Sequence, residues 1–394
     1  MSTSPPLSVA VQGLRPSVFA RLAPRLAARA AAGAPVIPLQ IGDTHRAPVA
    51  EALAAATATA AEIGRYGSTS GLTALRAALA RHRRAAGLRA AASGDHVLVG
   101  TGCTHALFCA VRAVVDPGDE VLVASPFWPL VPGVLRSAGA TVVQVPISQA
   151  LARDGFDLDA TLEAHRSART RAIYFISPNN PDGVVWPRPA LEVLAEFARR
   201  HDLWVLADEV YADYVYDGVH HHIADLPGMA GRTISTYSLS KSHGLAGARV
   251  GYAVATPAVV AAANRIANHT VYHGPEAMQR VALAAVTHGD DWIDAARASY
   301  REARDGAASR LANAGLPFRA AEGGSFLFVD LAEPLAGRPL DGLLERTIDA
   351  GVMVAPGAAM GEGYERHVRI CFTGVPAPTV ADGVARFVAT VAAF

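Results

Sequence analysis

Between residues 95 and 255 the sequence alternates short, almost continuously apolar segments with longer segments of helical character. Strands that are apolar on both faces are typical of a parallel sheet with helices on both sides. The pattern therefore predicts an α/β fold with a mostly parallel sheet flanked by helices. The segments predicted as strands are Val97–Val99, Glu120–Ala124, Thr141–Val145, Ala172–Ile176, Leu203–Ala207 and Val250–Val254.

The sequence after this region changes character twice. It is helical from about residue 257 to 315, and a shorter β/α pattern follows, with apolar segments at Ser325–Asp330 and Val368–Phe372 and a helix between them. A chain of 394 residues is long enough for two domains. The predicted units are an N-terminal segment (1–45) that packs with the small domain, a large domain (46–289) and a small C-terminal domain (290–394).

The first 42 residues contain several arginines and no acidic residue. This composition leaves two interpretations. The segment is an organellar transit peptide, or it is a first helix from about Arg15 to Ala32 that leads into a strand at Val36–Gln40. We favour the helix.

Composition argues against several classes of function. The formal net charge is zero and basic residues are spread along the chain, so we expect no nucleic-acid partner. No segment offers the roughly 18 consecutive apolar residues of a membrane-spanning helix. Cys103, Cys109 and Cys371 lack disulfide or zinc spacing, and no secretion signal is visible. We therefore expect a cytoplasmic protein that acts on small molecules.

One lysine lies in an unusual local sequence. Lys241 follows Ser238 and Ser240 and precedes a loop of small residues that leads to Arg249. Desolvation lowers the pKa of a lysine amine, which can then attack a carbonyl carbon. The hydroxyl and guanidinium groups are suited to binding phosphate. The segment predicts a nucleophilic amine beside an anion-binding loop; the alternative is an exposed lysine in a serine-rich turn.

Two polar segments follow predicted strands, where ligands bind in parallel α/β sheets. At Gly100–Leu107 small residues open a helix, so backbone N–H groups and the Thr104 hydroxyl can approach a phosphate. A plain β–α turn is the alternative there. Trp128 follows the next strand and can stack on a planar ring, although core packing is the commoner fate of tryptophan.

Two further strands are followed by amide, carboxylate and phenol groups. Asn180 lies in Ser177–Gly183, which is also a turn sequence, and Asp208 and Tyr211 follow the strand Leu203–Ala207. A carboxylate at this position can hold a protonated ring nitrogen, and a phenol can donate to a phenolate oxygen. The alternative for Asp208 is a capping role.

Together and in this order, these segments resemble the fold type I pyridoxal-phosphate-dependent aminotransferases of classes I and II, the aspartate aminotransferase superfamily. The resemblance extends from about Leu39 to Phe372. It implies that the large domain binds pyridoxal 5′-phosphate (PLP). It also implies that Lys241 forms the internal aldimine with PLP and that Asp208 holds the ring nitrogen.

The resemblance implies a role for each of the other matched residues. Those that resemble the phosphate-binding cup are Ser238, Ser240, Arg249, Cys103 and Thr104. The remaining matches are Asn180 and Tyr211 at the ring 3′ oxygen, Trp128 on the ring face, Arg369 and Gly42 at the substrate carboxylate, and Tyr66 at the phosphate bound by the partner subunit.

The reaction implied is transamination. An amino group moves between an L-amino acid and a 2-oxo acid in a ping-pong cycle, with Lys241 as the base that moves a proton between the substrate α-carbon and the cofactor. The match at Tyr66 implies a homodimer with active sites shared across the interface. Another PLP enzyme on the same scaffold is the alternative: a β-lyase, a cyclopropane-forming synthase, or a cyclase or oxidase of specialised metabolism. The presence of Lys241, Asp208 and Arg369 disfavours a regulator without turnover.

The sequence departs from the family pattern in two loops. Asp182 stands where a threonine is usual, so we expect altered hydrogen bonding there with the cofactor contact of Asn180 retained. The segment Asp43–Pro48 replaces an acidic-Pro-aromatic pattern at the edge of the substrate site. Either His45 or Arg46 faces a polar or acidic substrate side chain, or the loop is simply solvated.

Histidines raise two more questions. His220–His222 suggest a metal, but consecutive side chains cannot all face one ion, so we expect a solvated loop and no metal ligand. His273 lies where relatives present residues toward the neighbouring active site, which makes it a candidate substrate contact.

Overall fold

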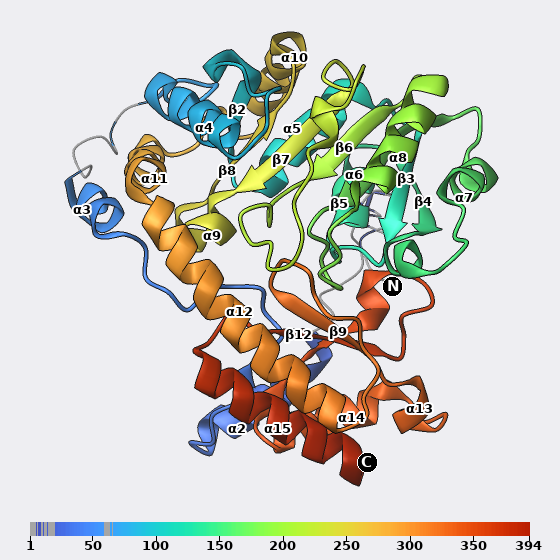
Figure 1. The fold of residues 1–394 in the computed structure, drawn as a ribbon. Coiled ribbons are helices and arrows are strands. Elements are labelled where there is room, and N and C mark those ends of the chain that lie inside the picture. The colour runs from blue at the N-terminus through green and yellow to red at the C-terminus, as the bar shows by residue number, and fades with distance from the viewer. Residues whose placement is uncertain are drawn as a thin grey trace.

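A computed structural model describes residues 20–58, 64 and 66–394, together with positions 5, 7, 8, 11 and 14. These residues form a seven-stranded sheet covered by helices and a smaller body with a three-stranded and a two-stranded sheet (Figure 1). The long helix α12 (Asp290–Asn313) runs from one body to the other and packs on α15 (Ala377–Ala393). In the described part of the chain, no helix is both long and apolar enough to cross a bilayer.

The large sheet has the strand order β2-β8-β7-β6-β5-β3-β4. β8 is antiparallel to its neighbours β2 and β7, whereas β4, β3, β5, β6 and β7 run parallel to one another. The prediction of a mostly parallel sheet is therefore confirmed. The strands are β2 (Val97–Thr101), β3 (Glu120–Ser125), β4 (Thr141–Pro146), β5 (Thr170–Ile176), β6 (Trp204–Asp208), β7 (Thr233–Ser238) and β8 (Val250–Val254).

The sequence analysis did not identify β7, which lies inside the sheet between β6 and β8. Its sequence Thr-Ile-Ser-Thr-Tyr-Ser is rich in hydroxyl groups and lacks the apolar run expected of a buried strand. All six residues are nevertheless buried. Position within the sheet, and not local hydrophobicity, determines this strand.

Alternating side chains of the strands pack against helices on opposite faces. In β5, Ala172, Tyr174 and Ile176 belong to one core, and Ile173 and Phe175 belong to another. The first face is covered by α5 (Cys103–Val114), α6 (Val131–Ser137) and α10 (Pro257–Asn268). The other face is covered by α4 (Thr73–Ala85), α7 (Leu158–His165), α8 (Arg188–Arg200) and α11 (Glu276–His288).

The smaller body has its own hydrophobic core. Its three-stranded sheet is antiparallel with the order β11-β12-β9, and β1 pairs in parallel with β10. The strands are β1 (Ile37–Pro38), β9 (Phe326–Asp330), β10 (Val352–Met353), β11 (Ala355–Pro356) and β12 (His367–Cys371). The helices of the protein not yet given, in either body, are α2 (Ala23–Ala31), α3 (Ala50–Ala58), α9 (Leu239–Ser242), α13 (Ala332–Leu335) and α14 (Leu340–Asp349).

Part of the arginine-rich N-terminal segment forms a helix, α2 (Ala23–Ala31). The predicted start at Arg15 lies outside the described residues, and α2 follows a 3₁₀ turn at Ala20–Leu22. Arg25 forms ion pairs with Asp349 at 2.7 Å and Glu345 at 3.1 Å on α14. The strand that follows pairs only at Ile37–Pro38 and is shorter than predicted.

Candidate active site

A cavity of about 330 Å³ lies at the carboxyl ends of the parallel strands. Of the residues matched to the family's cofactor and substrate positions, it brings together all except Tyr66. These lining residues come from both bodies of the protein: Gly42, Cys103, Thr104, Trp128, Asn180, Asp208, Tyr211, Ser238, Ser240, Lys241, Arg249 and Arg369.

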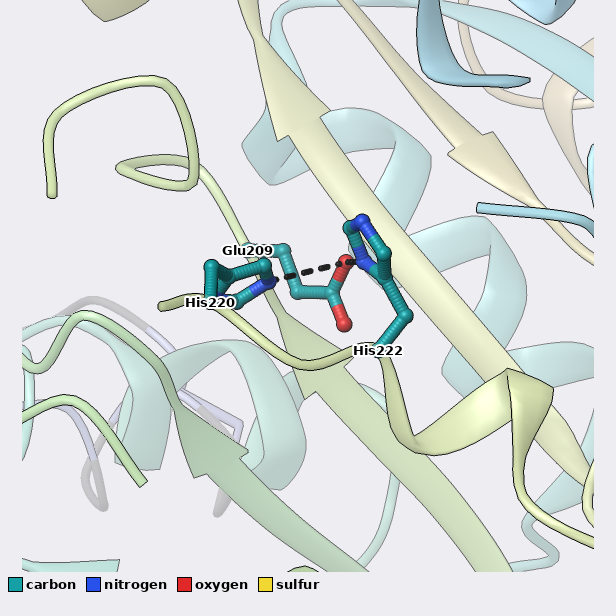
Figure 2. A group of neighbouring side chains, drawn as sticks. All are labelled: Glu209, His220 and His222. Carbon is teal, nitrogen blue, oxygen red and sulfur yellow. Dashed lines mark hydrogen bonds and ion pairs between the residues drawn. The ribbon is translucent and has the colours of Figure 1, made fainter. Parts of the chain in front are cut away.

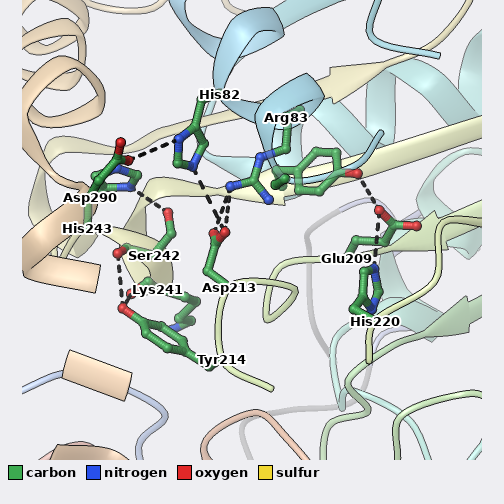
Figure 3. Close-up of polar contacts among 12 residues, drawn as sticks. His82, Arg83, Glu209, Asp213, Tyr214, His220, Lys241, Ser242, His243 and Asp290 are labelled. Atoms are coloured by element: carbon green, nitrogen blue, oxygen red, sulfur yellow. Dashed lines mark hydrogen bonds and ion pairs between the residues drawn. The ribbon is translucent and has the colours of Figure 1, made fainter. Parts of the chain in front are cut away.

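Lys241 is the only lysine in the sequence. It lies in α9, directly after β7, and its Nζ donates a hydrogen bond to the carbonyl oxygen of Gly42. The hydroxyl of Tyr214 donates to the carbonyl oxygens of Lys241 and Ser242, each at 3.0 Å, and so fixes the backbone here (Figure 3). Burial lowers the pKa of Lys241 below its ordinary value, which increases the share of nucleophilic amine.

Asp208 is the last residue of β6 and its side chain is buried. The Tyr174 hydroxyl donates to Oδ2 at 2.7 Å. Burial raises the pKa of Asp208 to about 6. No basic side chain of the described residues forms an ion pair with it, so a protonated ring nitrogen in the cavity would supply the missing positive charge.

Hydroxyl groups and a guanidinium gather at one end of the cavity. Ser238 caps α9, and its Oγ accepts a hydrogen bond from the Ser240 N–H at 3.3 Å. The Arg249 Nη1 donates to the Ala246 carbonyl oxygen at 2.9 Å. Among residues 20–58, 64 and 66–394, no carboxylate forms an ion pair with Arg249, so an anion in the cavity can take that place.

Two glycines allow the positive groups of this anion site to come close together. A Cβ on Gly251 would lie 2.2 Å from the backbone nitrogen of Cys103, at the N-terminus of α5. Gly102 has φ +80°, and a Cβ there would lie 2.5 Å from Arg249 Nη2. The helix N-terminus and the guanidinium therefore converge only because both positions lack a side chain.

Arg369 reaches the cavity from β12 of the smaller body. Nη1 donates to Asn180 Oδ1 and Nη2 to the Gln40 carbonyl oxygen, both at 2.8 Å, and the guanidinium lies 4.1 Å from the Phe326 ring centre. Nε is buried and without a hydrogen-bond partner. Burial lowers the pKa of Arg369, and none of the described carboxylates pairs with it. A substrate carboxylate would satisfy this buried cation.

Tyr211 and Cys103 present neutral donors to the cavity. Burial raises the pKa of the Tyr211 phenol, which keeps its proton. Burial and the nearby Asp208 also raise the pKa of the Cys103 thiol well above its ordinary value. Trp128 is half-buried and lines the cavity.

Asp182 ties its loop to neighbouring segments. Its Oδ1 accepts hydrogen bonds from Asn179 Nδ2 at 2.8 Å, Ser148 Oγ at 3.1 Å and the Val184 N–H at 3.3 Å. The carboxylate thus satisfies three donors and is itself buried. Asn180 keeps its place on the cavity wall.

His45 and Arg46 do not line the cavity. His45 Nδ1 lies 3.1 Å from the Thr373 carbonyl oxygen, and the Arg46 guanidinium lies 5.8 Å from the Trp292 ring centre. The hypothesis that either side chain faces the substrate has no support from this arrangement.

Tyr66 lies away from the cavity and is 85% exposed. Its ring meets those of Tyr272 and His273 edge-on, at 5.4 and 5.7 Å between centres. His273 Nε2 accepts a hydrogen bond from the Gly67 N–H at 3.2 Å. His273 therefore supports the segment around Tyr66 and is not part of the cavity of its own chain.

The prediction of a solvated histidine loop is wrong for two of its three residues. The side chains of His220 and His222 are 8% and 6% exposed, and both lie against Glu209 (Figure 2). Alternate residues of an extended segment point to the same side, so positions 220 and 222 can share a neighbour.

The sequence analysis missed three residues that support the site. They are Tyr174, which bonds to Asp208; Phe326, which lies beneath Arg369; and Tyr214, which holds the backbone of Lys241. Each is an aromatic residue in an apolar or loop segment, where core packing is the default interpretation. The absence of any other lysine was a signal available in the sequence.

Comparison with known proteins identifies the family of this chain. Residues 34–387 match the family described as aminotransferase class I and II. The arginine–pyruvate transaminase AruH of Pseudomonas aeruginosa is 37% identical over 353 residues, which cover 88% of each chain. The aspartate/prephenate aminotransferase of Thermus thermophilus is 32% identical over 379 residues, covering 93% of this chain and 94% of that protein.

Solved structures share the fold. The aspartate aminotransferase of Thermus thermophilus with maleate has a TM-score of 0.88 and 28% identity, over 98% of this chain and 100% of that one. The N-succinyldiaminopimelate aminotransferase of Mycobacterium tuberculosis has a TM-score of 0.86 and 29% identity, with the same coverage. The chain thus belongs to the class I and II aminotransferases, and it is a PLP-dependent transaminase with the fold type I architecture.

Proposed function

We propose that Lys241 is the residue through which this transaminase binds PLP and transfers the amino group. The observation that carries the proposal is the placement of the only lysine of the chain in a cavity between two unmatched charges. Within the part of the chain that the structure describes, Asp208 is a buried carboxylate without a basic partner, and Arg249 is a guanidinium without an acidic one. PLP has a basic ring nitrogen and an anionic phosphate, so these residues fit its two ends.

When bound, PLP serves as an electron sink for the bond broken at the substrate α-carbon. In the proposed mechanism, Asp208 keeps a positive charge on the ring nitrogen side of the cavity. Arg249, Ser238, Ser240 and the N-terminus of α5 would hold the phosphate. Trp128 would cover the ring, and Asn180 and Tyr211 would donate to the 3′ oxygen. Cys103 and Thr104 would complete the phosphate site.

The substrate end of the mechanism rests on Arg369 and Lys241. Arg369 grips the α-carboxylate through its planar fork, beside the backbone of Gly42. This orients the α-carbon toward Lys241, whose amine, with its lowered pKa, accepts and returns the α-proton. Phe326 and Trp128 exclude water, which strengthens these interactions.

Borohydride reduction of the PLP-loaded enzyme, followed by proteolysis and mass spectrometry, tests the assignment of Lys241. We expect the cofactor mass on the peptide that contains Lys241. Because the chain has no other lysine, modification of any other peptide, or of none, would contradict the proposal.

Arg369→Lys is expected to raise KM for the amino donor about 100-fold, with a smaller effect on kcat, because an ammonium cannot reproduce the two-pronged contact. Steady-state kinetics with each donor measures this. Arg366→Lys, an exposed position next to the same strand, is the matched control and should leave KM unchanged. An unchanged KM for Arg369→Lys would show that another residue binds the carboxylate.

The substrates are proposed as an L-amino acid and a 2-oxo acid, and the relatives suggest which to try. A single-turnover panel without acceptor should include arginine, aspartate and diaminopimelate, because similar enzymes are named for them or their derivatives. Conversion of the absorbance to that of pyridoxamine phosphate identifies a donor. Consumption of amino acid without that conversion would favour the β-lyase, synthase or oxidase alternative.

We also propose a homodimer in which Tyr66 reaches the phosphate bound by the partner subunit. Tyr66 is exposed, and the Tyr272 ring that it contacts is exposed as well, which suggests that this aromatic pair is covered by a partner subunit. A role for His273 near the neighbouring active site would follow from its contact with Tyr66.

Tyr66→Phe is expected to weaken PLP binding about tenfold, because it removes one hydrogen bond to a charged phosphate. Absorbance titration with PLP measures the affinity, and analytical ultracentrifugation should show an unchanged dimer. Unaltered PLP affinity would argue that Tyr66 does not reach a phosphate, and a monomeric wild type would exclude the shared site.

The division into an N-terminal segment (1–45), a large PLP-binding domain (46–289) and a small domain (290–394) is likewise proposed. The separate hydrophobic core of the smaller body, to which α12 contributes, supports it, since the large sheet has cores of its own. A cytoplasmic location is proposed on the basis of three cysteines that form no disulfide.

A further inference from the structure

Glu209, His220 and His222 form a compact cluster of metal-ligating side chains outside the active-site cavity (Figure 2). One ligand-type atom from each residue lies within 4.8 Å of the other two. His222 Nδ1 is 2.7 Å and His220 Nε2 is 3.6 Å from Glu209 Oε2. The two imidazole ring centres are 4.7 Å apart.

Several polar atoms of this cluster have no hydrogen-bond partner. Both ring nitrogens of His220 are buried and unpartnered, and so is Glu209 Oε1. Buried polar atoms are nearly always satisfied in folded proteins. His220 is thus held inside the protein, next to a carboxylate, without a hydrogen bond that would explain its position.

The surroundings of the cluster favour coordination. His222 Nε2 lies 3.4 Å from the Ala86 carbonyl oxygen, which can only accept a hydrogen bond. In the metal-free protein His222 Nδ1 donates to Glu209 Oε2, and the Tyr237 hydroxyl donates to the same oxygen. With Nε2 held by the carbonyl, a bound cation would take the place of the Nδ1 proton, as in metal-binding histidines whose outer nitrogen is held by a carbonyl. The nearby Arg83 does not oppose a cation strongly, because its Nη2 pairs with the Asp213 carboxylate at 2.7 and 2.9 Å (Figure 3).

We propose that Glu209, His220 and His222 bind a divalent transition-metal ion with the preferences of Zn²⁺. Two imidazoles and one carboxylate are a common zinc donor set, with bonds of about 2.0–2.2 Å and water as a fourth ligand. Tetrahedral bonds of that length place ligand atoms about 3.3 Å apart. The 2.7 Å and 3.6 Å separations differ from this value by about 0.6 and 0.3 Å, and the ligand atoms of all three residues lie within 4.8 Å of one another, so binding would draw the side chains into a tighter arrangement. The ion joins the loop that carries both histidines to the end of β6.

Zinc binding to the untagged, metal-free, PLP-loaded enzyme tests this proposal by isothermal titration calorimetry. The wild type is expected to bind one Zn²⁺ per subunit and to show a higher Tm in its presence. His220→Ala is expected to lower the affinity at least about 100-fold and to lose most of the Tm shift. His221→Ala is the matched control, because His221 lies between the two ligands but outside the cluster, and it should bind like the wild type.

Two further measurements keep the result unambiguous. His220→Phe fills the same space without a ligand atom, so it should fold and still lose zinc binding. The Co²⁺-loaded enzyme should lack the charge-transfer absorbance of a thiolate ligand. The proposal is overturned if the wild type binds no stoichiometric zinc, if His220→Ala and His221→Ala bind it equally, or if the Co²⁺ spectrum reports cysteine coordination.

Discussion

Replacement of Lys241 by alanine is expected to lower the transamination rate about 10⁴-fold and to abolish the visible absorbance of lysine-bound PLP. The loss lies at the upper end of what one positioned base contributes, because the same amine is also the group that attaches the cofactor. The fold should survive, since the Tyr214 hydroxyl holds the backbone carbonyl of Lys241 through a hydrogen bond that does not depend on the amine.

Steady-state and single-turnover kinetics measure the Lys241→Ala effect, with circular dichroism to confirm folding. Ser242→Ala is the matched control, because this neighbouring side chain bonds to Ser238 and His243 and does not line the cavity. Its rate should stay close to that of the wild type. Transamination by Lys241→Ala at an undiminished rate would contradict the proposal that Lys241 binds PLP and transfers the proton.

Asp208→Asn is expected to lower kcat about 10²–10³-fold, the cost typical of removing one preorganised electrostatic group from an active site. The amide cannot balance the charge of a protonated ring nitrogen. Tyr174→Phe removes only the 2.7 Å hydrogen bond to Asp208 and keeps the carboxylate, so its loss should be much smaller. Equal losses in the two variants would show that orientation, and not charge, is what Asp208 contributes.

The same residue gives a pH dependence in the cofactor-free protein. Burial raises the pKa of Asp208 from 3.8 to about 6, so the folded state binds its proton more tightly than the unfolded state. Its contribution to stability is therefore present below pH 4 and is lost as the pH rises through 6. Relative to Asp208→Asn, the wild type should lose about 2 kcal/mol of unfolding free energy between pH 4 and pH 7. Denaturant unfolding of both proteins at the two pH values measures the difference, and an unchanged difference would show that Asp208 is not desolvated.

Most of the large sheet and most of the site follow from the sequence. The six predicted strands correspond to β2, β3, β4, β5, β6 and β8. Because parallel strands end at one edge of a sheet, residues such as Asn180 and Asp208 could be placed together before any coordinates were known. The local sequence pattern was sufficient to predict these strands, because short, continuous apolar segments in a globular protein are typical of buried parallel strands.

Other features depended on contacts between distant segments. Thr233–Ser238 is too polar to predict as an interior strand, and it becomes one because β6 and β8 supply hydrogen bonds on both sides. The pairing of Tyr174 with Asp208 requires the register of β5 against β6, where Ile176 lies opposite Asp208. Neither strand's sequence alone specifies this register.

The sequence by itself determined the α/β class, the sheet-edge location of the site and the choice of the single reactive amine, because hydrophobic periodicity and residue chemistry are local properties. Only the tertiary structure decided the burial and the partners of these groups. It left Arg369 without a carboxylate, set Asp208 beside Tyr174, and turned His220 and His222 from an exposed loop toward Glu209. Burial and charge balance arise from segments far apart in the chain, so no local pattern can specify them.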